Sequence, residues 1–238
     1  MSQSKKEKFH HWLDKLIPTY ARLPLFIVVV FNFSVYFLSR LFAADRKHYI
    51  LSSALDSQIP LIPWTILIYL GCYLYWIAYY LYCPGLDKER GLQFLLADIL
   101  GKVVCAFCYT LFPTTMIRPE VTEPGLWNDW IRILYQVDPA DNLFPSLHCF
   151  ISWLCYIGVR GNKTVPRWVR SFALVFSILV FLSTLTTRQH VIIDIVAGVL
   201  LAELCYFLAT RVPVLSLLEK FRKKQTDKGN HQYPHKNN

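Results

Sequence analysis

Residues 59–82 read IPLIPWTILIYLGCYLYWIAYYLY, a run of 24 residues without a charged side chain. A helix needs about 20 apolar residues to cross the hydrocarbon core of a bilayer, which is about 30 Å thick. The run therefore predicts a membrane-spanning helix. It ends at Cys83-Pro84-Gly85, where proline and glycine favour a turn.

Five further segments are also long and apolar enough to predict membrane-spanning helices. In chain order, the third and the sixth of the six segments contain ionisable residues. Together the six segments predict an all-α, polytopic membrane protein with a six-helix domain over residues 23–211. A basic N-terminus (residues 1–22) and a basic tail (residues 212–238) flank this domain. The other five predicted spans are Leu23–Ser39, about Leu92–Phe112, Phe144 to the residue before Arg160, about Trp168–Leu185, and about Val191–Ala209.

The overall composition excludes two broad classes of protein. The chain has 238 residues, of which 54% are hydrophobic and 17% are charged. Soluble domains are about 25% charged. So much apolar surface excludes intrinsic disorder. Its concentration in long blocks argues against a soluble multi-domain enzyme.

The positive net charge has two readings, nucleic-acid binding or membrane topology. The formal net charge is +9. With six spans, 18 of the 25 Lys and Arg residues fall on the side of the termini, and six fall on the other side. Such an excess marks the cytoplasmic face. We therefore expect both termini to be cytoplasmic, and we expect no nucleic-acid partner.

The longest predicted loop, residues 113–142, lies on the outer side and is too long for a simple connection. Part of it has helical periodicity, with two tryptophans on the apolar face, which predicts a helix in the membrane interface. This helix is either a lid or lipid entry ramp, or a plain interfacial anchor. Its apolar face comprises Leu126, Trp127, Trp130, Ile131 and Leu134.

Two short motifs bring histidine to the outer ends of predicted spans. Pro145-Ser146-Leu147-His148 opens the fourth span, and the free N–H groups of a helix start favour anions. His190 and Asp194 open the sixth span and share one face of its helix, because they are four residues apart. A carboxylate so placed holds one imidazole nitrogen and leaves the other free as nucleophile or base.

Topology gathers these motifs with two arginines on the outer side. An arginine fork suits phosphate oxygens. Two histidines, an aspartate, a serine and arginines together suit phosphoryl transfer through a phosphohistidine, in which one histidine attacks phosphorus and the other protonates the leaving oxygen. The candidate residues are Arg118, Ser146, His148, Arg188, His190 and Asp194.

The motifs resemble those of the type 2 phosphatidic acid phosphatase superfamily, whose pattern is K-x6-R-P, P-S-x-H and S-R-x5-H-x3-D. The first matches at Arg118-Pro119, the second at residues 145–148, and the third at Ser183, His190 and Asp194. Leu111 and Thr184 replace the Lys and Arg of the pattern. The altered pattern is similar to the inositol phosphorylceramide and sphingomyelin synthase branch.

The resemblance implies a role for each candidate residue. His190 would be the nucleophile oriented by Asp194, and His148 would be the general acid. The phosphate would be bound by Arg118, Ser146 and Arg188. No metal or cofactor is implied, and the partner is a lipid phosphate in the bilayer, acted on at the extracytoplasmic face.

The sequence leaves several alternatives open. The acceptor is water in a phosphatase or a lipid alcohol in a headgroup transferase of the synthase type. A non-catalytic lipid-binding protein is a third reading, and a homo-oligomer remains open. Asp98 and Lys102 are expected to neutralise each other within the third span, and Glu203 to form structural hydrogen bonds.

Overall fold

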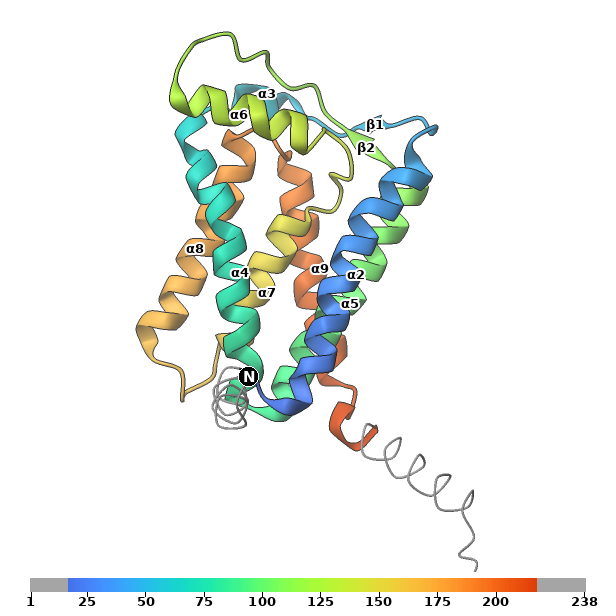
Figure 1. Ribbon diagram of the computed structural model, residues 1–238, viewed down its shortest axis with the longest axis vertical. Coiled ribbons are helices and arrows are strands. Elements are labelled where there is room, and N and C mark those ends of the chain that lie inside the picture. Colours follow the sequence, from blue (N-terminus) through green and yellow to red (C-terminus); the bar gives the residue numbers. More distant parts are fainter. Residues whose placement is uncertain (1–16, 218–238) are drawn as a thin grey trace, which may run out of the picture.

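The computed structural model describes residues 17–217 as a helical bundle with its long axis vertical in Figure 1. Successive long helices alternate in direction along this axis, and residues 17 and 217 lie at the same end of the bundle. The helices of the bundle are α2 (Thr19–Ala43), α4 (Ile66–Leu86), α5 (Lys88–Leu111), α7 (Leu147–Val159), α8 (Arg167–Thr186) and α9 (Ile192–Thr210).

The opposite end of the bundle, called the site end below, carries the short elements. Two strands pair in parallel with Tyr49 opposite Thr114, and α6 crosses the tops of the long helices (Figure 1). The short elements are β1 (Tyr49–Ile50), α3 (Ala54–Gln58), the 3-10 helix η1 (Pro63–Thr65), β2 (Thr114–Thr115) and α6 (Leu126–Val137).

Among the described residues, five helices are long and apolar enough to cross a membrane. They are all the helices of the bundle except α7. Helix α7 has 13 residues and therefore rises about 20 Å, less than a bilayer core. The all-α membrane class is thus supported, whereas the count of six spans stays a prediction.

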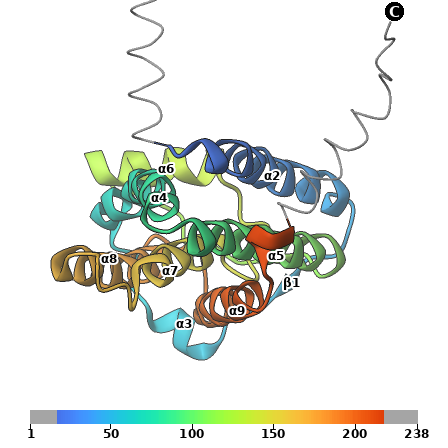
Figure 2. The ribbon, with the colours of Figure 1, turned by 90° about the horizontal axis from the view of Figure 1, so that it is seen from below.

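Helix α7 is short because it begins late. Ser146 is its N-cap and Pro145 precedes it, so the chain before them enters the bundle as irregular backbone. Such backbone is tolerated at membrane depth where protein encloses it. Asn142, Leu143 and Pro145 of this segment are buried, and α7 itself lies among α4, α5, α8 and α9 (Figure 2).

The first helix is longer than the predicted span. It begins at Thr19 and ends at Ala43, so it includes Arg22 and Arg40, the two charges that bracket the apolar run. Arg40 is accommodated by an ion pair with Asp141, whose Oδ2 lies 3.0 Å from its Nε. A paired charge does not need to end a helix, which is why charge alone misplaced this boundary.

Helix α6 forms over residues 126–137, as the periodicity predicts. Ile131 and Leu134 are buried against Ile66 and Tyr69, which join α6 to the bundle. Leu126 and both tryptophans of its apolar face remain exposed. Its place in a membrane interface remains a prediction.

The buried charges inside the bundle are paired. Lys102 Nζ lies 2.7 Å from Asp98 Oδ2, and both side chains are inaccessible to solvent. Towards the other end, Glu203 accepts both hydrogen bonds of the Arg160 fork, at 2.6 and 2.8 Å, and one from Trp153 at 2.8 Å. The predicted neutralising pair and the structural role of Glu203 are confirmed.

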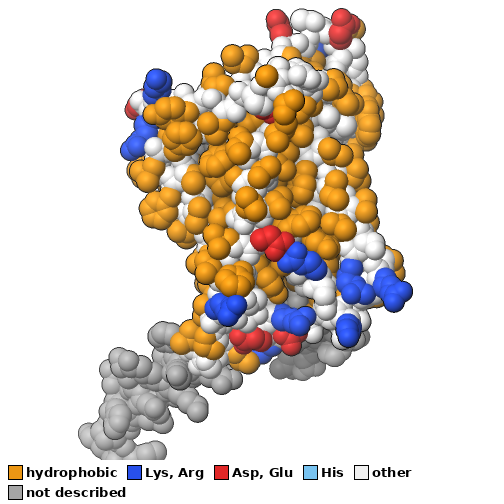
Figure 3. Space-filling model, turned by 180° about the vertical axis from the view of Figure 1, so that it is seen from behind, with side chains coloured by type: hydrophobic (Ala, Val, Ile, Leu, Met, Phe, Trp, Pro, Cys, Tyr) orange, Lys and Arg blue, Asp and Glu red, His pale blue; other side chains and the backbone are white. Residues whose placement is uncertain are grey.

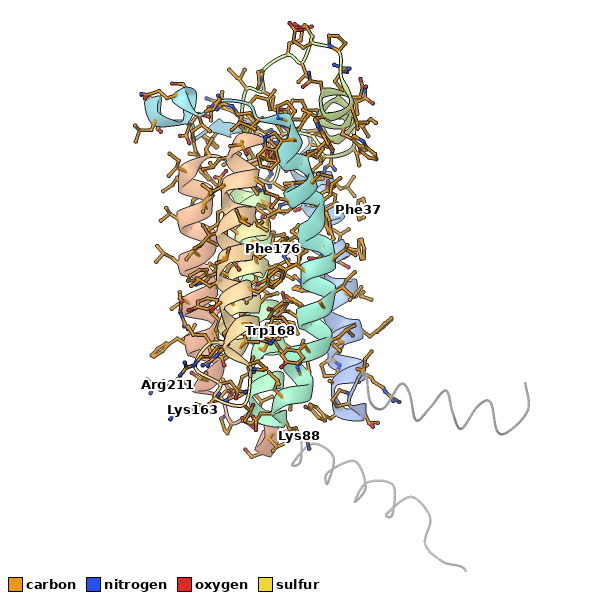
Figure 4. The ribbon with its side chains drawn as sticks, turned by 90° about the vertical axis from the view of Figure 1, so that its left-hand side faces the viewer. Phe37, Lys88, Lys163, Trp168, Phe176 and Arg211 are labelled. Atoms are coloured by element: carbon orange, nitrogen blue, oxygen red, sulfur yellow. The ribbon has the colours of Figure 1, made fainter. Side chains whose placement is uncertain are left out.

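The outer surface separates apolar and charged regions. On the face in Figure 3, hydrophobic side chains cover the middle, and most Lys and Arg side chains gather towards the end opposite the site end. Lys88, Lys163 and Arg211, from three separate segments, lie at that end in Figure 4. Most of the two predicted cytoplasmic segments, residues 1–16 and 218–238, lies outside the described residues.

Candidate active site

The first turns of α7 and α9 meet at the site end of the bundle. The Ser146 N–H donates to the backbone oxygen of Asp194 at 3.1 Å. The Tyr109 hydroxyl on α5 donates to the Pro145 oxygen at 2.6 Å. The structure thus joins two motifs that lie more than forty residues apart in the sequence.

A glycine permits this close approach. A Cβ atom on Gly198 would lie 2.6 Å from the Ser146 backbone oxygen and 3.2 Å from the Phe150 backbone nitrogen. Backbone atoms cannot swing aside as a flexible side chain can. Any larger residue at position 198 must therefore separate α9 from α7.

We expect Gly198→Ala to lower the free energy of unfolding by about 1–3 kcal/mol, the usual cost of overpacking. Turnover should also fall, because His148 lies on α7 and His190 lies in the turn that leads into α9, the two helices that are forced apart. Thermal unfolding in detergent and an activity assay check both effects. Gly85→Ala is the matched control, since a Cβ at Gly85 meets no atom within 4 Å. Equal behaviour of the two variants would contradict the packing argument.

His190 is held by the aspartate one turn further along α9. Its Nδ1 lies 3.3 Å from Asp194 Oδ2, and the same oxygen accepts the Val191 N–H at 3.0 Å. Asp194 is fully buried, and His190 is only 6% exposed. A carboxylate facing Nδ1 favours the tautomer that carries its proton there. The other nitrogen, Nε2, is then unprotonated and available to attack an electrophile.

His148 is the second residue of α7 and faces His190. The two imidazole ring centres are 5.6 Å apart. Two aromatic rings of α4 support His148, with ring centres at 4.6 Å for Tyr69 and 5.4 Å for Trp76. No described residue accepts or donates a hydrogen bond at its buried Nε2. This nitrogen is therefore not committed to the fold.

Both histidines line one cavity of about 40 Å³ at the site end. A volume of this size holds more than one water-sized group. The walls come from α2, α5, α7, the loop after α6, and the turn between α8 and α9. The lining residues are Tyr36, Tyr109, Asp138, Pro139, Asp141, Asn142, Leu143, Leu147, His148, Gln189 and His190.

The predicted phosphate ligands surround this cavity but do not line it. Ser146 is fully buried, and its Oγ accepts the Cys149 N–H as the cap of α7. Arg118 donates to the Arg188 and Asp138 backbone oxygens at 3.1 and 2.7 Å and to Gln189 Oε1 at 2.6 Å. Burial lowers the pKa of Arg118, and nearby Asp138 opposes this shift.

Arg188 contacts α3 and is not among the residues that line the cavity. Its Nη1 donates to the Asp56 backbone oxygen at 2.6 Å, and its backbone has a positive φ of 56°. This left-handed conformation is uncommon outside glycine and reverses the chain between α8 and α9. The predicted phosphate contact of Arg188 remains a prediction.

The two family positions that lack their cation differ in environment. Leu111 is 66% exposed at the end of α5. Thr184 is fully buried, and its backbone oxygen accepts the N–H groups of Gln189 and His190 at 2.9 and 3.2 Å. An arginine side chain at position 184 would have no space in this packing. The loss of this cation is therefore built into the local structure.

Asp56 is a supporting residue that the sequence reasoning missed. Its Oδ1 accepts the Ile192 N–H at 2.8 Å, so a residue of α3 caps the start of α9. Burial raises the pKa of Asp56, but hydrogen bonds from Ser53 and Ile192 outweigh it and leave the pKa below its usual value. The capping-box pattern Ser53-x-x-Asp56 signals the start of α3, but nothing local signals the contact of Asp56 with Ile192.

Asp138 is a second missed residue. Its Oδ1 accepts the Tyr36 hydroxyl at 2.8 Å, and its Oδ2 accepts the Tyr69 hydroxyl at 2.9 Å. Asp141, beside it in the cavity wall, is paired with Arg40; burial raises the pKa of Asp141, and Arg40 opposes this shift. These contacts join α2 and α4 to the loop after α6, and no short motif in the sequence signals them.

The described part of the chain does not gather metal ligands. Among residues 17–217, no group of three or more His, Cys, Asp or Glu side chains is arranged to hold a metal ion. What the site offers is a pair of facing imidazoles, one of them backed by a buried carboxylate. This arrangement can supply a nucleophile and a proton donor to the same small ligand.

The fold and the site together define a polytopic helical membrane protein with a His–His–Asp centre. Residues 132–208 match a family model described as the PAP2 superfamily, the type 2 phosphatidic acid phosphatases. The match contains both histidines and Asp194, so it bears out the family resemblance for the second and third motifs, whereas Arg118-Pro119 lies outside the matched residues. It indicates a membrane protein of phosphatase or phosphotransferase type. No curated protein and no solved structure gives a significant match to the chain.

Proposed function

We propose that this protein is a membrane lipid phosphatase or phosphotransferase that acts through a phosphohistidine at the extracytoplasmic face. One observation carries the proposal: His148 and His190 line the same cavity, and Asp194 backs His190. A protein that only bound lipid would need neither the second imidazole nor the buried carboxylate. The family match supports the same class of reaction.

The proposed reaction has two steps. In the first, Nε2 of His190 attacks phosphorus, the bond from phosphorus to the leaving oxygen breaks, and His148 gives that oxygen a proton. In the second, His148 takes a proton from the acceptor, whose oxygen attacks phosphorus and releases His190. Asp194 holds Nδ1 of His190 and stabilises the positive charge that the ring acquires. No redox change and no metal is needed in either step.

The acceptor in the second step decides between two activities. Water gives a phosphatase, and a lipid alcohol gives a headgroup transferase like the inositol phosphorylceramide and sphingomyelin synthases. The transferase reading is supported by the two missing family cations, at Leu111 and Thr184, and by Asp138 and Asp141 in the cavity wall. A doubly charged phosphate monoester fits such a wall less well than a singly charged diester does.

The substrate tail is proposed to remain in the bilayer while its phosphate reaches the site end. Trp127 and Trp130 on α6 are exposed there and would meet lipid headgroups. In this reading both termini are cytoplasmic, as the gathering of Lys and Arg at the opposite end supports. The contacts of Arg118, Ser146 and Arg188 with phosphate are part of the proposal.

A panel of labelled lipids, assayed with purified protein in detergent, tests the proposal. We expect either free phosphate or a transferred headgroup, and added ceramide or diacylglycerol should divert product only if the protein is a transferase. The phosphoenzyme should be trapped when the reaction is quenched early. A protein that binds these lipids but yields neither product nor phosphoenzyme would support the non-catalytic reading instead.

A further inference from the structure

Gln189 is a buried polar residue of the cavity wall that the proposed machinery does not use. It is 2% exposed and lies between the turn at Arg188 and the proposed nucleophile, His190. The Gln189 N–H donates to the Thr184 oxygen at 2.9 Å, which fixes its backbone against the end of α8. The Cα of Gln189 is therefore held in a fixed position beside the histidines.

The orientation of the Gln189 amide follows from its partner. Arg118 Nη2 lies 2.6 Å from the side-chain oxygen, Oε1. A guanidinium can only donate hydrogen bonds, so the group facing it must be the carbonyl oxygen. The NH₂ group of the amide is consequently turned away from Arg118.

This NH₂ group has no partner in the fold. Among residues 17–217, none accepts a hydrogen bond from the buried Nε2 of Gln189. A buried polar group left unpaired is costly, and natural structures keep one mainly where a ligand or water completes it. Since Gln189 lines the cavity of His148 and His190, the ligand that completes it belongs to that cavity.

A phosphoryl group supplies the acceptors that this amide lacks. Negative charge on the phosphoryl oxygens must be met by donors as the histidine attacks. No Lys or Arg is among the described residues that line the cavity, and the donors of Arg118 resolved in the structure are directed at protein oxygens. Two buried side-chain nitrogens in the cavity wall lack a partner among the described residues, His148 Nε2 and the amide nitrogen of Gln189. His148 is already assigned to proton transfer, so the Gln189 amide is free to serve the phosphoryl oxygens.

We propose that Gln189 binds the phosphoryl group of the substrate through Nε2, and that Arg118 acts through Gln189 as a positioning residue. This inference rests on the proposed function. It differs from the interpretation of the Arg118-Pro119 motif in the sequence, in which the arginine binds phosphate directly. Here arginine holds a neutral amide, which replaces the cation missing at Thr184.

Gln189→Glu separates a binding role from a structural one. Glutamate keeps an oxygen for Arg118 and replaces the NH₂ donors by an anionic oxygen, so the fold should be retained while phosphate is repelled. We expect turnover of the active lipid to fall by about 10²–10³-fold or more, the loss typical of one oxyanion donor. Gln136→Glu, the same change on exposed Gln136 of α6, is the matched control and should leave turnover unchanged.

The positioning role of Arg118 is tested by a double-mutant cycle of Arg118→Ala and Gln189→Ala, with kcat and KM measured for each. If Arg118 acts through Gln189, the double variant should be no worse than the worse single variant. Losses that multiply would show that Arg118 meets the phosphate independently. That result would overturn the positioning role.

Orthovanadate, an analogue of the phosphoryl group in transfer, gives a readout that does not require turnover. We expect it to raise the melting temperature of the parent and of Gln136→Glu but not of Gln189→Glu. Equal shifts in all three, or none in the parent, would overturn the inference. A parent that binds orthovanadate through Gln189 but processes no lipid would instead refute the proposed function.

Discussion

Replacing His190 by alanine is expected to lower turnover by about 10⁶-fold, the scale of loss when the nucleophile of a covalent enzyme is removed. The reason lies in the geometry of the site. His190 is nearly buried, Asp194 fixes its Nδ1, and Nε2 is left for attack on phosphorus in the cavity. No neighbouring group offers a second nucleophile with a carboxylate behind it among the cavity residues described.

The measurement combines turnover with covalent trapping. A lipid labelled at phosphorus is mixed with purified protein, quenched within one turnover, and analysed for label that is lost in acid but stable in base, as phosphohistidine is. The parent should carry the label and His190→Ala should not. His48→Ala is the control, because His48, half-buried on the loop before β1, is not among the residues that line the cavity, and its Nδ1 lies 3.0 Å from the Arg46 backbone oxygen. Full activity in His190→Ala would rule out the phosphohistidine.

Replacing His148 by glutamine is expected to slow the reaction by about 10²–10⁴-fold, the usual contribution of general acid–base catalysis. The loss should depend on the leaving group. A lipid alkoxide needs a proton as it departs, whereas nitrophenolate is stable as an anion. We therefore expect His148→Gln to lose far more activity with the lipid than with nitrophenyl phosphate.

Comparison of the two substrates makes the prediction specific to proton donation. A variant that merely disturbed packing against Tyr69 and Trp76 would lose both activities in equal proportion. His48→Gln provides the matched control on the same end of the bundle. Equal losses of the lipid and nitrophenyl activities in His148→Gln would remove the general-acid role, although the cavity geometry would stand.

Local properties of the chain were enough to predict much of this protein. Apolar length predicts the helices, since a bilayer requires about 20 apolar residues per crossing. The spacing of His190 and Asp194 correctly predicted their contact, although α9 begins only at Ile192, so His190 meets Asp194 from the turn before the helix and not from the same helical face. Periodicity likewise located α6, and the i, i+4 spacing of Asp98 and Lys102 predicted their ion pair.

Boundaries and long-range contacts were beyond these local rules. Charge bracketed the first span at Arg22 and Arg40, yet the helix continues past both. At the Arg40 end, Asp141 from a distant loop pairs with the arginine. The fourth span was expected from Phe144, whereas α7 starts at Leu147 and is too short to cross a bilayer core by itself. The Arg40 end depends on a partner far away in the sequence, whereas the start of α7 is set locally by the Ser146 cap.

The sequence by itself determined the membrane class, the helices and the catalytic inventory, because hydropathy and helical periodicity are properties of neighbouring residues. Only the tertiary structure decided how that inventory is used. It brought His148 to His190, turned Arg188 towards Asp56, and left the amide of Gln189 unpartnered in the cavity. A hydrogen-bond donor can pair with an acceptor from any part of the fold. The orientation of such a side chain is therefore set only when the helices are packed.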